Sequence, residues 1–343
     1  MNVAYDGAMA ATLRDIADRA GVSSAAVSMA LNNKKGVGRD KAREIRRIAG
    51  EMGYLKLPEV DVAGRTVHFI QVLKPSQTWD DSYKVFIAEY IQGLTIAAAT
   101  SGIIVEVKTF RTEDLESVRA SLREADILGT MFLGAGLFPR DIRILKEATA
   151  SQVFIDVCYP GIGVDCIDMD NAQCVYEVVE HLIARGHTSI GLVQAEEWTP
   201  NFAMREEAFR AALDELGLAD SDRSEAFRIQ RDQNRGKEQM VEQLRSRTSL
   251  PTALFCVNDM IAYNCIHACE ELGIAVPGDI AVVGFDDLPA SKIMHPRLTT
   301  VSVPRERISK RALEVLLDRV NTSAYKAPER ILIGGRLVVR ESA

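Results

Sequence analysis

The chain lacks the long apolar runs that membrane proteins need. No stretch of its 343 residues approaches the roughly 20 apolar residues of a membrane-spanning helix. The N-terminal segment carries an acidic residue, Asp6, and has no apolar core of the kind found in secretory signal peptides. We therefore expect a cytoplasmic protein, long enough to form two or three domains with buried cores.

The chain also lacks the short motifs of common catalytic and nucleotide-binding sites. It contains no Gly-x-Ser-x-Gly turn, no phosphate loop of the Walker type and no Gly-x-Gly-x-x-Gly after its first predicted strand. Two carboxylates, Asp286 and Asp287, are adjacent in sequence, so their side chains diverge and cannot face one bond. We expect a binding protein with no cofactor, and no enzyme.

Cysteine is present, but without the spacing of a metal or redox motif. No Cys-x-x-Cys pair occurs, and the pair Cys265 and Cys269 has His267 between them on another side of the predicted helix. We expect no metal site. All six cysteines lie in apolar stretches, which predicts buried, reduced thiols at Cys158, Cys166, Cys174, Cys256, Cys265 and Cys269.

Net positive charge is absent from the chain as a whole but present at its start. The formal net charge is −7. Residues 1–57 hold ten basic and six acidic residues, a net charge of +4, so the remainder carries −11. This division predicts a basic head that can bind a polyphosphate and an acidic body that stays away from it.

The basic head, residues 1–57, is predicted to form three short helices. In "TLRDIADRAGVSSAAVSMALNN" apolar residues recur at helical spacing, Gly21 ends the first helix and Ser23 can cap a second. A third helix in "KAREIRRIAGEMGY" is predicted to end at Gly53. We therefore expect a small all-α helix-turn-helix domain at 1–57 and a linker at 58–66, bounded by Pro58 and Gly64.

From residue 67 onward, apolar strand-like runs alternate with amphipathic helices. One round runs from "VHFIQVL" to "QVFIDV" and a second from "SIGLVQ" to "IAVVGFDD". This alternation predicts an α/β core, 67–343, of two doubly wound lobes with parallel sheets. We expect lobe 1 at about 67–164 and 295–325, and lobe 2 at about 165–294 and 326–343. Ligands of such sheets bind where strands end.

Seven stretches together resemble the lac repressor (LacI/GalR) family of bacterial transcription regulators. They are "TLRDIADRAGVSSAAVS", "MGY", "DNAQCVYEVVEHLIARGHTSIGLV", "MREEAFRAAL", "PTALFCVND", "VPGDIAVVGFDD" and "HPRLTTV", in the family's order. The resemblance covers nearly the whole chain. It implies a DNA-binding head joined to a core like a periplasmic sugar-binding protein, and a repressor of carbohydrate-utilisation genes.

The resemblance implies that the second helix enters the major groove of an operator. It places the base-reading positions at Ser24, Ala25 and Met29, and the phosphate contacts at Thr12, Ser23, Ser28, Asn32 and Tyr54. Position 29 departs from the family pattern, because a methionine can contact a thymine methyl group but cannot make a bidentate bond to guanine. The alternative is that Met29 packs inward and another side chain reads the groove.

The linker "YLKLPEVDVAGRT" is a second departure from the family pattern. It is shorter than the usual hinge helix, carries Glu59 and Asp61, and lacks the usual asparagine and leucine. Acidic side chains near phosphates weaken DNA binding. Two alternatives stay open: Leu57 or Val60 takes over part of the minor-groove wedge, or the wedge is absent.

For the core, the resemblance implies an effector in the cleft between the lobes. It places effector contacts at Asp156, Asn201, Arg205, Asn258 and Asp286, and the aromatics Trp79, Tyr83 and Phe86 lie near the first cleft loops, with Trp198 and Phe202 near the second. Carboxylates accept from sugar hydroxyls and arginine offers a fork of donors, so we expect a sugar or sugar phosphate. A purine is the alternative. Asn258, Asp259 and Asp287 can instead be turn or cap residues.

The family binds pseudo-palindromic operators as two-fold dimers, so we expect a homodimer formed through the first lobe, with helices at 86–100 and 113–124 contributing. No appended heptad run suggests a tetramer. We expect the bound protein to be associated with the nucleoid. The effector can act as inducer or corepressor. A sugar-binding receptor of a transport system is the alternative from another class, disfavoured by the DNA-binding head.

Overall fold

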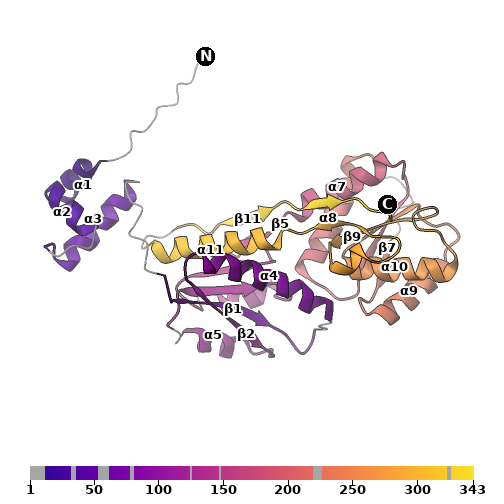
Figure 1. Ribbon diagram of the computed structural model, residues 1–343, viewed down its shortest axis with the longest axis horizontal. Helices are drawn as coiled ribbons and strands as arrows, with labels where there is room; N and C mark the ends of the chain where they lie inside the picture. The colour runs from indigo at the N-terminus through magenta and orange to yellow at the C-terminus, as the bar shows by residue number, and fades with distance from the viewer. Residues whose placement is uncertain are drawn as a thin grey trace, which may run out of the picture.

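The computed structural model describes residues 12–31, 36–52, 62–77, 81–123, 126–146, 148–218, 226–322 and 326–343. These residues form a small helical head and two α/β lobes that follow one another along the long axis of the molecule (Figure 1). Five residues with predicted roles lie outside the described ranges: Asn32, Tyr54, Leu57, Val60 and Trp79.

The head consists of α1 (Leu13–Ala20), α2 (Ser24–Leu31) and α3 (Arg39–Glu51), as the apolar spacing predicts. Thr12 and Asp15 form a capping box at the start of α1, and Gly21 ends it in the left-handed conformation, with φ of 66°. Ser23 begins α2 by accepting from the amide of Ala26 at 3.1 Å. The helices enclose a small core built around Ile16, Val27, Ile45 and Ile48.

The first lobe has a six-stranded parallel sheet with the order β11-β5-β4-β3-β1-β2. Its strands are β1 (Thr66–Val72), β2 (Ile104–Phe110), β3 (Gly129–Leu133), β4 (Gln152–Ile155), β5 (Cys166–Met169) and β11 (Arg330–Ile333). Helices α4 (Asp81–Ala99) and α11 (Arg305–Asn321) pack together on one face. Helices α5 (Leu115–Arg123) and α6 (Pro139–Leu145) cover the other, where they enclose a separate cluster with Ile70 and Phe132.

The second lobe repeats this plan with the strand order β12-β10-β9-β8-β6-β7, in which only the β10–β12 pair is antiparallel. Its strands are β6 (Ile190–Ala195), β7 (Ala226–Ile229), β8 (Ala253–Cys256), β9 (Ala281–Asp286), β10 (Thr299–Ser302) and β12 (Arg336–Val338). Helices α7 (Asn171–Ala184) and α8 (Pro200–Glu215) form one packed pair; α9 (Gln233–Arg245) and α10 (Asp259–Leu272) form the other, on the opposite side of the sheet (Figure 1). A short 3-10 helix, Pro289–Lys292, follows β9.

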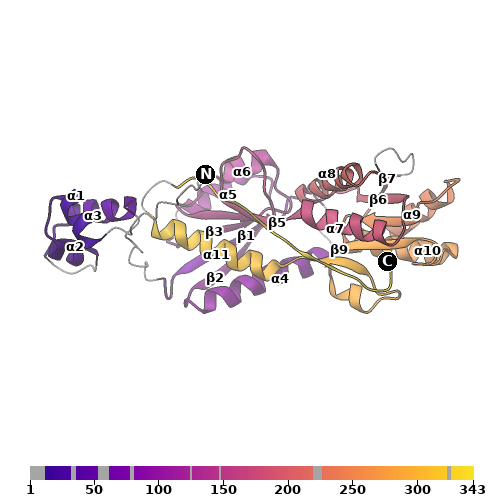
Figure 2. The ribbon, with the colours of Figure 1, turned by 90° about the horizontal axis from the view of Figure 1, so that it is seen from above.

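The predicted lobe boundaries are wrong for three strands. β5 and β11 were expected in lobe 2 but pair in the first sheet, and β10 was expected in lobe 1 but pairs with β9 in the second. The physical reason is strand pairing. β5 pairs with β4 and so extends the first sheet, β11 pairs with the free edge of β5, and β10 pairs with β9 in the second sheet. The chain therefore passes between the lobes three times, and its last segment runs along both (Figure 2).

Within the described ranges, no helix is long and apolar enough to cross a membrane. All six cysteines are buried and free, as the sequence predicts.

Candidate ligand-binding cleft and nucleic-acid interface

The second helix of the head presents one free face. Val27 and Ala30 turn into the core of the head, whereas Ser24 and Ala25 are exposed. Ser28 and Met29 are half-buried beside them. The predicted base-reading positions thus share the accessible side of α2, which is the geometry required of a helix that enters a DNA groove.

Besides Ser23, the predicted DNA contacts Thr12 and Met29 are already engaged within the head. The Thr12 hydroxyl donates to the Asp15 carboxylate at 2.7 Å and accepts from its amide at 3.3 Å. Met29 lies close to Gly36, since a Cβ added to Gly36 would stand 3.0 Å from its sulfur. Met29 is therefore partly packed and partly exposed. This placement is intermediate between the two alternatives, in which Met29 either reads the groove or packs inward.

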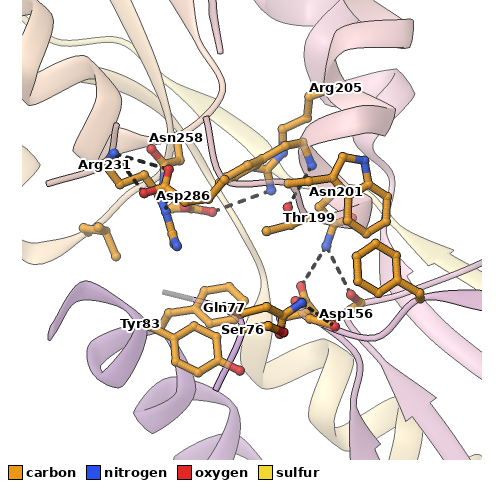
Figure 3. Close-up of a pocket in the computed structure, with 18 residues that line it drawn as sticks. Ser76, Gln77, Tyr83, Asp156, Thr199, Asn201, Arg205, Arg231, Asn258 and Asp286 are labelled. Atoms are coloured by element: carbon orange, nitrogen blue, oxygen red, sulfur yellow. Dashed lines mark hydrogen bonds and ion pairs between the residues drawn. The ribbon is translucent and has the colours of Figure 1, made fainter. Parts of the chain in front are cut away.

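The core contains a cavity of about 310 Å³ between the two lobes (Figure 3). It lies at the carboxyl ends of strands from both sheets. Ser76, Phe138 and Asp156 follow strands of the first lobe, and Glu197, Arg231, Asn258 and Asp286 follow or end strands of the second. Parallel sheets place their strand ends, and hence these polar side chains, on a common edge.

Arg205 is the central cation of the cleft and is only 2% exposed. It extends from α8, and its Nε donates to Asn171 Oδ1 at 3.0 Å while Nη1 donates to the Val257 carbonyl at 2.6 Å. Its guanidinium lies over the ring of Phe285, 3.6 Å from the centroid. These bonds orient the guanidinium so that Nη2 of Arg205 faces Asp286, 3.7 Å from its Oδ1.

Asp156 is the main acceptor on the first lobe. Its Oδ1 accepts from Asn201 Nδ2 at 3.0 Å and from the Tyr90 hydroxyl at 3.2 Å. Burial raises the pKa of the Asp156 carboxyl to about 7, although Arg205 and Arg305 oppose that shift. Because Asn201 belongs to α8 of the second lobe, this hydrogen bond joins the two walls of the cleft.

Asp286 links the cleft to the helices of the first lobe. Its Oδ1 accepts from Arg305 Nη2 at 3.1 Å, and Arg305 Nη1 donates to Glu89 of α4 at 2.6 Å. Burial raises the pKa of Asp286, while Arg205 and Arg305 lower it. Arg305 therefore joins Asp286 to α4 through two charged contacts.

Backbone strain is concentrated at these carboxylates. Among the described residues, three that are not glycine have positive φ: Asp156 (59°), Asp286 (120°) and Asp287 (53°). Such conformations cost free energy and cluster at binding sites, where the surrounding contacts hold them. Two of the three line the cavity.

An aromatic pair closes part of the cleft between the lobes. Phe138 of the first lobe stacks on Trp198 of the second, with ring centroids 4.6 Å apart and an interplanar angle of 9°. The cations of Lys74 and Arg140 lie 4.9 and 5.6 Å from the centroid of Phe138. On the wall below, Tyr83 stacks on Phe86 at 6.0 Å. The cleft thus combines apolar ring faces with a charged floor.

The cavity brings together seven of the eight predicted effector contacts: Asp156, Asn201, Arg205, Asn258, Asp286, Tyr83 and Phe86. Trp198 and Phe202 also line it. Asn258 has the alternative role as well, because its Oδ1 accepts from the Ile261 amide at 3.0 Å and caps α10.

The two neighbouring aspartates do not line the cavity. Asp259 accepts from Ser291 and Thr300 at 2.6 and 2.5 Å. Asp287 pairs with Arg340 at 2.5 Å. The expected turn-capping role of Asp287 is thus replaced by an ion pair with a residue distant in sequence.

The sequence did not single out several cleft residues, including Arg231, Glu197 and Phe138. Arg231 Nε lies 3.5 Å from Glu197 Oε2, and each residue follows a strand of the second sheet. Both come two residues after strands of the second sheet, but the family motifs quoted above contain neither. No group of three or more potential metal ligands occurs in the described part of the chain.

Both the head and much of the core are similar to known protein families. Residues 12–56 match the family described as bacterial regulatory proteins, lacI family, and residues 179–343 match the periplasmic binding protein-like domain. The HTH-type transcriptional repressor CytR of Escherichia coli (strain K12) is 28% identical over 341 residues, covering 97% of this chain and 96% of that protein. The repressor PurR of Haemophilus influenzae is 26% identical, with 97% and 98% covered.

Solved structures share the fold over nearly the whole chain. A complex of the transcriptional regulator CelR with cellobiose aligns with a TM-score of 0.69 at 24% identity, covering 97% of this chain and all of that one. A lac repressor dimer bound to operator and an anti-inducer aligns with the same TM-score at 21% identity, with 97% and 99% covered.

Proposed function

We propose that the chain, whose residues 12–56 match the lacI family of bacterial regulatory proteins and whose residues 179–343 match the periplasmic binding protein-like domain, represses carbohydrate-utilisation genes and that a sugar or sugar phosphate in the interlobe cleft switches its affinity for operator DNA. The proposal assigns effector binding to Asp156, Asn201, Arg205, Asn258, Asp286, Tyr83 and Phe86. It assigns no chemical step to the cleft and places the protein in the cytoplasm.

The observation that carries this proposal is the alternation of fixed donors and acceptors on both walls of the cleft. Asp156 and Asp286 offer carboxylate oxygens, and Arg205 and Asn201 offer donors already oriented by their own partners. A polyol presents hydroxyl groups that donate and accept at neighbouring positions, so it satisfies such a set. The rings of Tyr83 and Phe86 provide an apolar face against which a pyranose ring can pack.

A second candidate effector is a nucleoside or purine. The stacked aromatics on both lobes favour it, since planar heterocycles bind to ring faces. The paired carboxylates favour the sugar, because a base offers fewer donors to them.

In this proposal the head binds operator DNA through α2. Ser24, Ala25 and Met29 read base edges. Thr12 and Ser23, which precede α1 and α2, and Ser28 within α2 contact phosphates. The roles of Asn32, Tyr54, Leu57 and Val60, outside the described residues, stay predictions.

We also propose a homodimer formed through the first lobe. Val85 and Ile96 of α4 and Val107 of the adjoining strand β2 are exposed apolar residues on one side of that lobe. Apolar residues gathered on one surface are typical of protein interfaces. A two-fold dimer presents two heads to the two half-sites of a pseudo-palindromic operator.

Effector binding would act through a change of the angle between the lobes. The cleft contacts join both walls, and Asp286 continues through Arg305 to Glu89 on α4. A ligand that binds one lobe arrangement better than another shifts the population toward it. The first lobes of the dimer would then move, and with them the spacing of the heads.

The test is a panel of pentoses, hexoses, disaccharides, their phosphates, purines and nucleosides, screened against the full chain by thermal unfolding. A ligand that binds only the folded state raises the midpoint of unfolding. The proposal expects a sugar or sugar phosphate to raise it, and this rise to disappear in Arg205→Lys, which keeps the charge but loses the fork of donors. A rise with nucleosides alone would replace the sugar by the second candidate.

A further inference from the structure

Two cysteines of the first lobe lie in contact beside the cleft. Cys158 follows β4 and Cys166 begins β5, and their sulfur atoms are 2.6 Å apart. The intervening loop reaches the surface at Pro160, Gly161 and Gly163. Cys158 is 4% exposed and Cys166 is 2% exposed. Cys158 lies two residues after Asp156, whose amide donates to the Ile167 carbonyl at 3.0 Å.

The surroundings of the two thiols differ. Contacts with Cys166 and with the guanidinium of the exposed residue Arg330 lower the pKa of Cys158 to about 6. The same contact with Cys158, together with burial, raises the pKa of Cys166. A thiolate beside a cation is the reactive form of cysteine, and a neighbouring protonated thiol stabilises it. Cys158 is thus the nucleophile of the pair and Cys166 its partner.

A second cysteine pair in the same chain provides a comparison. Cys256 and Cys265 of the second lobe are completely buried, with sulfurs 3.7 Å apart. Burial raises the pKa of Cys265 well above its usual value. The two pairs share the same residue types, but only the pair of the first lobe lies under a surface loop and beside an arginine.

We propose that Cys158 and Cys166 are an oxidation site that forms a reversible disulfide with hydrogen peroxide. The site is separate from the proposed effector contacts and does not depend on the identity of the effector. Hydrogen peroxide is small and neutral, so it can reach thiols that larger oxidants cannot.

The reaction balances with one peroxide and two thiols. The Cys158 thiolate attacks one peroxide oxygen, the O–O bond breaks, and the departing hydroxide takes a proton and leaves as water. Cys166 then attacks the sulfur of the resulting sulfenic acid, the S–O bond breaks and a second water leaves. The two sulfurs together lose two electrons, and peroxide is reduced to two molecules of water.

The disulfide would tie the end of β4 to the start of β5. These two strands are neighbours in the sheet, with Phe154 paired to Cys166. The bond would close a short loop next to Asp156 and restrict the motion of the segment that presents this carboxylate to the cleft.

The test uses the full chain, fully reduced, freed of reductant and exposed to an equimolar amount of hydrogen peroxide. Remaining thiols are alkylated before trypsin digestion and mass spectrometry. Residues 147–185 form one tryptic peptide with three cysteines. We expect this peptide to lose the mass of two hydrogen atoms and to carry one alkyl group, on Cys174, whereas Cys256 and Cys265 stay reduced. Dithiothreitol should reverse the change.

Three variants assign the bond. Cys158→Ser and Cys166→Ser should each abolish the mass loss, and the matched control Cys174→Ser should retain it. Circular dichroism of each variant verifies the fold, and the measurement on the unmodified chain stands without them. Alkylation of all three cysteines after peroxide, a bond that includes Cys174, or equal oxidation of Cys256 and Cys265 would each overturn the proposal.

Discussion

Replacing Asp286 by asparagine tests the role of the cleft in the switch. The substitution keeps the shape of the side chain and removes its charge. In the structure Asp286 faces Arg205 at 3.7 Å and Arg305 at 3.1 Å, so both guanidinium groups lose one counterion. Arg305 keeps its ion pair with Glu89 at 2.6 Å, so this guanidinium retains one counterion.

The expected magnitude follows from the lost interactions. A hydrogen bond to a charged group contributes about 1.5–3 kcal/mol, and a tenfold change in affinity corresponds to about 1.4 kcal/mol. Loss of one effector bond to the Asp286 carboxylate should therefore weaken effector binding roughly 10- to 150-fold. Removing one partner of a buried ion pair also costs about 3 kcal/mol of stability, at the low end because Arg305 stays paired.

The assay is fluorescence anisotropy of a labelled operator duplex, titrated with the effector found in the panel. The half-maximal effector concentration should rise by the factor given above, while the affinity for DNA without effector stays within about twofold. Asp287→Asn is the matched control. Its carboxylate is the next one along the chain but pairs with Arg340, outside the cavity. Its half-maximal concentration should remain that of the unmodified protein.

An Asp286→Asn protein that folds, binds the duplex and responds to effector at the original concentration would show that the Asp286 carboxylate does not bind the effector. The carboxylate would then lie outside the effector site, and its strained backbone would have a purely structural origin. An equal loss in Asp287→Asn would point to a general destabilisation of the lobe, and urea denaturation of both variants would measure it.

Three further predictions follow from the cleft and the first lobe. In a Trp79→Phe background, the emission of Trp198 reports the stack with Phe138, so Phe138→Leu should shift that emission to longer wavelength, and an unchanged spectrum would mean that the stack is absent in solution. The pKa of Asp156 is about 7 in the fold but near 4 in an unfolded chain, so the folded state binds the proton more tightly, and its contribution to stability is complete below about pH 4 and lost as the pH rises to about 7. Asp156→Asn should flatten this fall in the free energy of unfolding, measured in urea, and a fall of the same size in the variant would contradict the shifted pKa. Gly134→Ala would place a Cβ 2.0 Å from a methyl carbon of Val157 and should cost about 1–3 kcal/mol, whereas Gly334→Ala, which meets nothing within 4 Å, should leave the unfolding midpoint unchanged.

Periodicity predicted most of the elements because each one has a local signal. The stop and cap residues of the head, Gly21 and Ser23, act within a few residues of themselves, and the structure places them as expected. The capping role of Thr12 was not predicted. The same holds for the alternation of strands and helices in the core. Periodicity could not predict to which sheet β5, β10 and β11 belong. Whether β5 pairs with β4 or with a strand of the other sheet depends on contacts between segments far apart in sequence.

In the candidate cleft, too, residues with a local sequence signal were predicted and residues placed by long-range contacts were not. Asp156, Asn201, Arg205 and Asp286 were found because they follow strands or match family motifs, and the structure brings them together. Arg305 could not be found in this way. It belongs to a helix of the first lobe and reaches Asp286 only because the chain passes between the lobes. The contact between Cys158 and Cys166 likewise depends on how the loop between them folds.

The most direct test of the account is selection of bound duplexes from a random DNA library with the full chain, repeated with each compound that raises its unfolding midpoint. We expect enrichment of a two-fold symmetric site, an affinity for this site that changes with a sugar or sugar phosphate, and loss of that change in Asp286→Asn. Failure to enrich a symmetric site, both with and without the compounds, would contradict it.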